Sequence, residues 1–189
     1  MITAYIWTPR GAAYGHASLR ITGGTPLGEA YVSYWPMTPG STKLFCSMPS
    51  RNRTLEQDVS GEDGQRPHHQ ITLDGLNETA IKAWWHIQSA RRDADADWCT
   101  VTRNCSTIVA ESLRVGGADY FVSPIAWDSW NAVWNPHGVL MYVTSLQRAL
   151  ASRARVNWEA VAARGVGAQA RFDRAMDQIH HVARPGRYF

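Results

Sequence analysis

Two short apolar segments near the beginning of the chain constrain the fold most strongly. Residues 2–7 (ITAYIW) and 16–21 (HASLRI) carry the apolar, β-branched and aromatic residues that strands favour, and Gly15 lies between them where the chain can turn. A hairpin is the simplest connection between two strands this close in sequence, and its strands are antiparallel. A third strand is expected at residues 30–35 (AYVSYW), ended by Pro36, because proline cannot donate to a strand ladder. The sequence therefore predicts a small antiparallel sheet near the start of the fold.

Helical patterns dominate the second half of the chain. Helices are expected in three segments with apolar residues at helical spacing, residues 78–91, 105–115 and 136–150. Before them, residues 37–67 are rich in Ser, Gly, Pro, Arg and Asp and are expected to form one long loop, followed by a strand at residues 69–73. Strands followed by helices indicate the α+β class, with a small antiparallel sheet packed on helices. We expect a catalytic domain over residues 1–150 and a C-terminal helical extension over residues 151–189.

The length, charge and hydropathy of the chain limit its partners. A chain of 189 residues with a net charge of +3 and no dense basic block is expected to be mainly one domain that does not bind nucleic acid. The beginning of the chain has no positively charged segment followed by a long apolar stretch, and no 18 apolar residues run together. We therefore expect synthesis in the cytoplasm and no stable membrane insertion, while export without a cleavable signal stays open.

Neither a cofactor nor a metal ion is expected. The three cysteines, Cys46, Cys99 and Cys105, are an odd number without C-x-x-C spacing, which disfavours both a disulfide framework and a zinc site. The alternating aspartates of the segment RRDADADW lack the following Gly and the distal Glu of a calcium loop. At least one thiol is expected to be free.

Cys105 lies where an extended stretch is expected to become a helix. Backbone N–H groups without helical partners and the positive end of the helix dipole favour a thiolate at this position. The same N–H groups can stabilise an oxyanion that forms during acyl transfer. Cys105 is therefore a candidate nucleophile, although a lone cysteine in a helix is more often an ordinary core residue.

His16 is the best candidate for the base that a nucleophilic thiol needs. It begins an expected strand and has small neighbours, Gly15 and Ala17, that leave room around the imidazole. A base held on a strand is rigid, which favours proton transfer over short distances. The other six histidines lie beside the loop, within helices or in the C-terminal segment, so they are weaker candidates.

The order of the segments GHASLRI, YVSYWP and RNCSTIVAESL resembles the circularly permuted NlpC/P60 branch of the papain-like superfamily. The resemblance covers about residues 1–150 and implies a permuted papain-like fold, in which the histidine strand precedes the cysteine helix. That superfamily includes lecithin:retinol acyltransferase-like proteins and several bacterial effector toxins.

The resemblance implies roles for five residues. Cys105 corresponds to the nucleophile and His16 to the base, and a polar group on a neighbouring strand orients the imidazole. Ser33 in the segment YVSYWP is the candidate for that third group, and it would share a strand face with Tyr31 and Trp35. A backbone carbonyl or a water molecule is an alternative orienting group. Asn104 and Tyr14 are candidate donors to the oxyanion or the substrate.

Three functions follow as expectations. The first is a cysteine hydrolase that cleaves an amide or peptide bond, such as one in a cell-wall peptide, through a thioester acyl-enzyme and serves as a secreted bacterial effector toxin. The second is a lipid acyl hydrolase or acyltransferase, and the third is a binding module that has lost catalysis. The expected partners are a peptide or acyl substrate and an immunity protein or a component of a secretion machine.

Overall fold

The computed structural model describes the chain except for residues 12, 24–27, 38–47, 92–97, 123–132 and 154–189. The chain divides into two compact units, Met1–Leu150 and Ala151–Phe189. Almost all of the second unit lies outside the described residues, and so does the expected helical extension. The account below therefore concerns the first unit.

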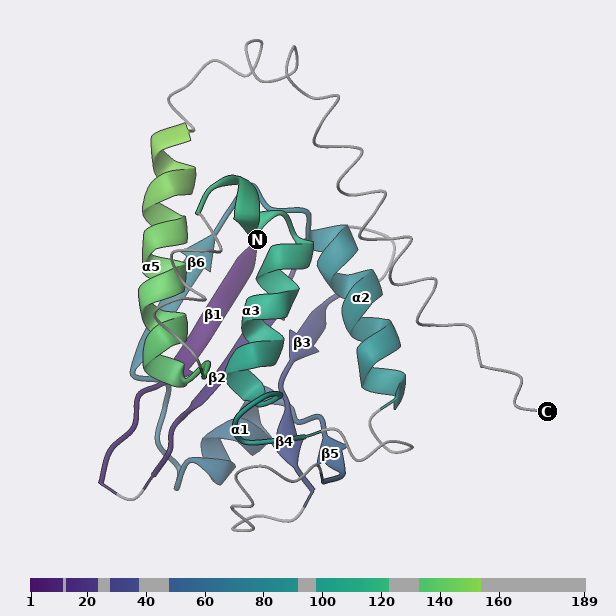
Figure 1. Ribbon diagram of the computed structural model, residues 1–189, viewed down its shortest axis with the longest axis vertical. Coiled ribbons are helices and arrows are strands. Elements are labelled where there is room, and N and C mark those ends of the chain that lie inside the picture. Colours follow the sequence, from purple (N-terminus) through teal and green to yellow (C-terminus); the bar gives the residue numbers. More distant parts are fainter. Residues whose placement is uncertain (12, 24–27, 38–47, 92–97, 123–132, 154–189) are drawn as a thin grey trace, which may run out of the picture. The chain divides into compact units, whose positions relative to one another are not determined.

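A four-stranded antiparallel sheet organises the first unit (Figure 1). Its strands, in the spatial order β3, β2, β1, β6, are Ala30–Val32, His16–Ile21, Ile2–Trp7 and His69–Leu73. The β1–β2 register pairs Trp7 directly with His16. The expected hairpin is confirmed, and so are the predicted bounds of β1, β2 and β6.

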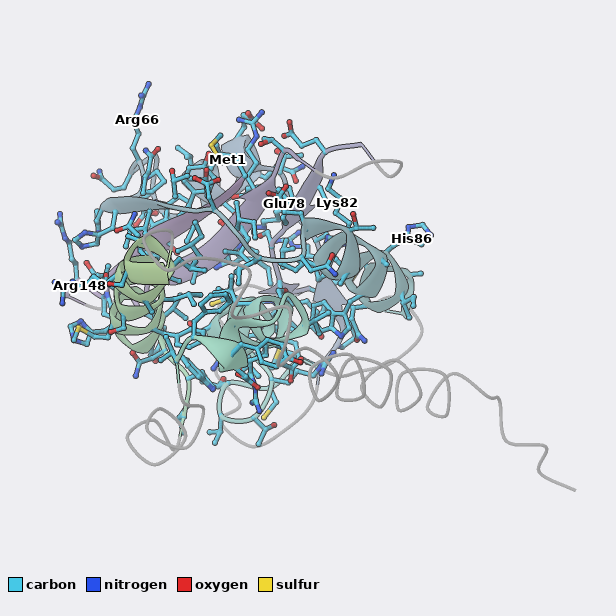
Figure 2. The ribbon with its side chains drawn as sticks, turned by 90° about the horizontal axis from the view of Figure 1, so that it is seen from above. Met1, Arg66, Glu78, Lys82, His86 and Arg148 are labelled. Atoms are coloured by element: carbon cyan, nitrogen blue, oxygen red, sulfur yellow. The ribbon has the colours of Figure 1, made fainter. Side chains whose placement is uncertain are left out.

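Three helices cover one face of this sheet (Figures 1 and 2). They are α2, α3 and α5, with bounds Glu78–Arg91, Cys105–Val115 and Pro136–Arg153. The middle helix α3 packs against β2 and against α2. The buried core joins strand and helix side chains, among them Ile6, Leu19, Ile108, Leu113 and Val143. The α+β class is confirmed, and the beginning of α3 lies at the same end of the sheet as the beginning of β2.

The predicted third strand, residues 30–35, is divided between two sheets. Its first part is β3, whereas Trp35–Pro36 forms β4 and pairs with β5, Ser50–Arg51, in a separate two-stranded sheet. The expectation that Pro36 ends a strand before it is wrong in detail, because Pro36 is itself a member of this short ladder. Proline is tolerated there because a two-residue ladder requires few donors.

The predicted loop over residues 37–67 contains regular structure, so that prediction was wrong. Besides β5 it holds helix α1, Leu55–Gly61, which begins with a capping box. The Thr54 side chain accepts from the Gln57 backbone N–H, and the Gln57 side chain accepts from the Thr54 backbone N–H. This reciprocal pair satisfies two donors at the start of a helix that is otherwise too short to be stable alone.

Met1, the residue before β1, is tied to the first turn of α2. The Met1 ammonium group forms an ion pair with Glu78, and Figure 2 shows the two residues side by side. Asn77 caps α2 by accepting a hydrogen bond from the Ala80 N–H at 3.0 Å. Among the described helices, none combines the length and the hydropathy that crossing a membrane requires.

Candidate active site

Cys105 is the first residue of α3, and Asn104 is the N-cap that fixes this helix start. The Asn104 Oδ1 atom accepts from the Thr107 N–H at 3.0 Å. Its Nδ2 group donates to the carbonyl oxygens of Thr100 and Trp134, each at 2.8 Å. The cap therefore holds the backbone on both sides of Cys105 and leaves the thiol at the positive end of the helix.

Cys105 is partly exposed as a residue, and its buried thiol is electrostatically activated. Burial opposes its ionisation, but attraction to the charged His16 ring and a hydrogen bond with that ring outweigh this cost. A backbone hydrogen bond at Ala17 and the Ser106 hydroxyl contribute in the same direction. The pKa of the Cys105 thiol is therefore below its ordinary value, as nucleophilic attack near neutral pH requires.

His16 lies at the beginning of β2 between two indoles. Only 2% of its surface is exposed, and its ring centroid lies 5.6 Å from that of Trp7 and 4.5 Å from that of Trp35. Burial alone would lower the pKa of His16, but the negative charges of Cys105 and Asp58 raise it to about 10. Aromatic faces also favour a cation. The structure thus favours a thiolate paired with an imidazolium.

Asp58 of helix α1 orients this imidazole. Its Oδ2 atom lies 3.1 Å from Nε2 of His16, and both side chains are buried. Burial would raise the pKa of Asp58, but the charge and hydrogen bond of His16 hold it below its ordinary value. Because Nε2 faces the carboxylate, Nδ1 is the ring nitrogen that remains for the thiol.

Three side chains from the β3–β4 segment also donate to Asp58. The Tyr31 hydroxyl donates to Oδ2, and the Ser33 hydroxyl and the Trp35 Nε1–H donate to Oδ1, all at 2.7 Å. Burial and the charge of Asp58 raise the pKa of Tyr31, so its phenol stays protonated and donates. The three residues alternate along the chain, but they do not share one strand, because Tyr31 is in β3, Trp35 is in β4 and Ser33 lies between the two. The Asp58 carboxylate is therefore saturated with donors and fixed in place.

The structure brings Cys105, His16 and Ser33 together. It also shows that the nearest polar neighbour of the His16 imidazole is Asp58 and not Ser33. The Ser33 hydroxyl lies 3.3 Å from Nε2 of His16 and 2.7 Å from Oδ1 of Asp58. The carboxylate is the closer and charged neighbour of the imidazole, so Ser33 supports Asp58, and Asp58 orients His16. The orienting group comes from a helix rather than from a neighbouring strand.

Asn104 and Tyr14, the two expected oxyanion donors, have different surroundings. Both N–H groups of the Asn104 amide are occupied by backbone carbonyls, so donating to a substrate would require breaking one of those bonds. Tyr14 lies in the β1–β2 connection with 70% of its surface exposed, and it has no hydrogen bond among the described residues. The oxyanion role of both residues stays a prediction.

Asp58 was missed from the sequence because the segment around it was interpreted as loop. The Thr54-x-x-Gln57 capping box was a usable signal for a helix there. Within the described residues, no three His, Cys, Asp or Glu side chains gather to hold a metal ion. The grouping of a thiolate, an imidazolium and a buried carboxylate is instead suited to nucleophilic attack and proton transfer.

Comparisons with known proteins add independent information. A family model described as the IcsB middle domain matches residues 47–166, more than half of the chain. The matched range includes Asp58 and Cys105 and begins after His16. Over 79 residues the chain is 38% identical to the multifunctional-autoprocessing repeats-in-toxin of Vibrio cholerae serotype O1 and 37% identical to that of Vibrio vulnificus. This stretch is 42% of the chain but 2% of each toxin, so the chain is similar to a small part of these bacterial toxins.

Proposed function

This chain belongs to the IcsB middle-domain family, and from that membership together with the arrangement of Cys105, His16 and Asp58 we propose that it is a toxin-type cysteine enzyme that forms a thioester with its substrate. The single observation that carries the proposal is the buried contact between His16 and Asp58 beside a thiol of lowered pKa. A carboxylate that fixes an imidazole next to a nucleophile at a helix start is the geometry that acyl transfer needs. The similarity to bacterial toxins supports the same reading.

The proposed reaction begins with attack of the Cys105 thiolate on the carbonyl carbon of an amide. The new C–S bond forms as the carbonyl electron pair moves to oxygen, and the N–H groups of Cys105 and Ser106 stabilise the resulting oxyanion. The adduct collapses, the C–N bond breaks, and the leaving amine takes a proton from His16. A thioester then remains on Cys105.

In the first proposed function, hydrolysis of the thioester completes the catalytic cycle. Water attacks the thioester carbon while His16 takes a proton from that water. The C–S bond breaks, the carboxylic acid leaves, and the sulfur regains its negative charge beside the imidazolium. Asp58 keeps the same hydrogen bond throughout and stabilises the charged ring.

We further propose that the fold is the permuted papain-like one. Support comes from the order of the elements, because the strand that begins with His16 precedes the helix that begins with Cys105. The small antiparallel sheet and the packing of α3 on β2 agree with that fold. A structural superposition on permuted papain-like enzymes that fails to align β2 with α3 would contradict it.

A second candidate function uses the same thioester with a different acceptor. His16 is 2% exposed, and this burial restricts the approach of water from bulk solvent to the base. Restricted access favours an acceptor that binds next to Cys105, such as the amine or hydroxyl of a second substrate. Of the lipid acyl hydrolase and acyltransferase alternative, this observation favours the acyltransferase, which differs from the first proposal in acceptor and product.

The decisive experiment is the capture of the acyl-enzyme. Purified protein is incubated with 4-nitrophenyl acetate, and the added mass is located by intact and peptide mass spectrometry. We expect the acetyl group on Cys105, its absence in Cys105→Ala and an unchanged result in Cys99→Ala, since Cys99 is buried and the groups that shift the pKa of its thiol do not include His16. Labelling of Cys105 no faster than free cysteine would leave the inactive binding module as the better account.

The acceptor and the compartment are then determined separately. Product analysis with cell-wall peptides, with phospholipids and with a phospholipid plus an amine separates amide hydrolysis from lipid hydrolysis and acyl transfer. Expression in the bacterial cytoplasm or, with a targeting signal, in the periplasm shows where the substrate is. Toxicity that persists in Cys105→Ala in both compartments would contradict a thioester mechanism.

A further inference from the structure

A polar cavity lies between β5 and α1, next to the candidate active site. Its volume is about 350 Å³, and it is lined by Arg51, Asn52, Arg53, Gln57, Ser60 and Gly61. We refer to this space as the arginine cavity. Helix α1 has one face toward His16, through Asp58, and another toward the arginine cavity, through Gln57, Ser60 and Gly61. Figure 1 shows α1, β4 and β5 together at the end of the sheet where α3 begins.

Two buried atoms among the residues that line the arginine cavity lack hydrogen-bond partners. They are the Nε atom of Arg51 and the Oδ1 atom of Asn52. The Arg53 guanidinium donates to the Gln57 carbonyl oxygen, but neither Arg51 nor Arg53 forms an ion pair within the described residues. Both arginines line the cavity, and a bound anion would accept from their guanidinium groups and offset their charge.

The two guanidinium groups are also close enough to repel. Burial and the charge of Arg51 lower the pKa of Arg53, whereas the carboxylates of Asp58 and Glu62 only partly offset this effect. Two neighbouring guanidinium groups without an ion pair among the described residues are an arrangement that suits a carboxylate or a phosphate.

Arg53 connects the arginine cavity with the imidazole. Its Cζ atom lies 3.9 Å from the centre of the Trp35 ring, and the same indole lies 4.5 Å from the His16 ring. Gly61 makes this stacking possible, because a Cβ atom at residue 61 would overlap the Arg53 guanidinium and approach the Trp35 ring to 3.0 Å. One indole therefore separates the arginine cavity from the catalytic imidazole.

We propose that the arginine cavity binds an oxyanion carried by the substrate, a carboxylate or a phosphate, while the substrate carbonyl meets Cys105. This inference rests on the proposed thioester chemistry and adds the substrate class: acyl donors with an acidic group that a chain long enough to pass the Trp35 indole connects to the reactive carbonyl. Arg51 and Arg53 bind the oxyanion, and the Asn52 amide accepts from a neighbouring N–H or O–H of the substrate.

The test uses a matched pair of activated esters. The acidic probe is 4-nitrophenyl hydrogen suberate and the neutral probe is its methyl ester; acylation of Cys105 releases 4-nitrophenolate from either. We expect the acidic-to-neutral ratio of kcat/KM to fall about tenfold in Arg51→Met, the factor that loss of one hydrogen bond to a charged group produces. Gly61→Ala keeps both arginines but obstructs the arginine cavity, and it should lower the same ratio.

Arg66→Met is the matched control, because it removes the same charge from an exposed side chain that points away from the protein in Figure 2. It should leave the ratio unchanged. A ratio that is equal in the wild type, Arg51→Met and Arg66→Met would overturn the substrate class while leaving the thioester proposal intact.

A binding measurement distinguishes failure of the proposed anion site from failure of the proposed thioester chemistry. Calorimetric titration of Cys105→Ala with inorganic phosphate and with succinate measures anion binding without catalysis and shows which oxyanion is preferred. We expect binding that Arg51→Met weakens about tenfold. If neither anion binds, the arginine cavity is not an anion site. If one binds but no ester acylates wild-type Cys105, the thioester chemistry fails and the cavity holds an anion with another purpose.

Discussion

Oδ2 of Asp58 lies 3.1 Å from Nε2 of His16, although 42 residues separate the two in the sequence. The contact joins the beginning of β2 to helix α1. This helix lies in the segment 37–67, which the sequence pattern predicted to be a loop. The contact turns a cysteine–histidine pair into a three-residue arrangement whose central imidazole has a fixed orientation. The first prediction concerns this carboxylate.

Asp58→Asn should lower the rate of Cys105 acylation by about 10²- to 10⁴-fold, the range associated with losing a correctly oriented general base. The amide cannot stabilise the imidazolium and favours the wrong tautomer of His16. Stopped-flow acylation by 4-nitrophenyl acetate measures the effect. Glu56→Gln removes an exposed carboxylate from the same helix and should change the rate less than twofold; equal losses in both variants would assign the effect to helix α1 rather than to Asp58.

The pH dependence should reveal the thiolate–imidazolium pair. Because the pKa of Cys105 is lowered, alkylation by iodoacetamide should proceed readily below the ordinary thiol pKa and level off as pH rises. Acyl turnover should also rise with deprotonation of Cys105 but fall again as His16 loses its proton at about pH 10, since the leaving group then has no acid. In His16→Ala the imidazolium no longer offsets the effect of burial on the pKa of the Cys105 thiol. The pH at which alkylation reaches half its maximal rate should therefore rise. A value that stays in place would contradict the pairing.

Stability in acid should depend on Asp58. The folded pKa of Asp58 is below its ordinary value of 3.8, so the carboxylate stabilises the fold above that pH, and the contribution is lost as pH falls through the folded pKa. Asp58→Asn should cost about 3 to 5 kcal/mol near neutral pH, because His16 remains buried without its charged partner. The difference from wild type should shrink in acid. Urea unfolding at several pH values measures it, and a constant difference would count against a charged native Asp58.

Asn104 should prove to be a helix cap and not an oxyanion donor. Asn104→Ser keeps a capping oxygen but loses both side-chain N–H donors, whereas Asn104→Ala loses the cap as well and should cost about 1 kcal/mol of stability. We expect acylation by Asn104→Ser within a few-fold of wild type. A loss of about 10²- to 10³-fold, as for removal of an oxyanion donor, would restore the catalytic assignment.

Local signals were sufficient for the elements that position the two principal residues. The strand that begins at His16 and the helix that begins at Cys105 have the predicted bounds, because the apolar patterns that predict them act over a few residues. The sequence also placed Tyr31, Ser33 and Trp35 on one strand face through the period of two residues. The structure puts donors from all three on one carboxylate.

The identity of that carboxylate depended on non-local structure. Asp58 is in a seven-residue helix with little apolar periodicity, and the β4–β5 pair brings Trp35 next to the Arg51 segment just ahead of it. Neither the pairing nor the burial of Asp58 follows from neighbours in sequence. Only the capping box at Thr54 gave a local sign that a helix begins there.

The donors around Asp58 also bear on the rate of the proposed acyl transfer. Tyr31, Ser33 and Trp35 are aimed at the carboxylate before any substrate binds, so their dipoles need not reorient when charge moves between sulfur and imidazole. In water the solvent would have to reorganise at each proton transfer. Here that polarisation is built in once, when the chain folds, and every turnover starts from an environment that is already preorganised.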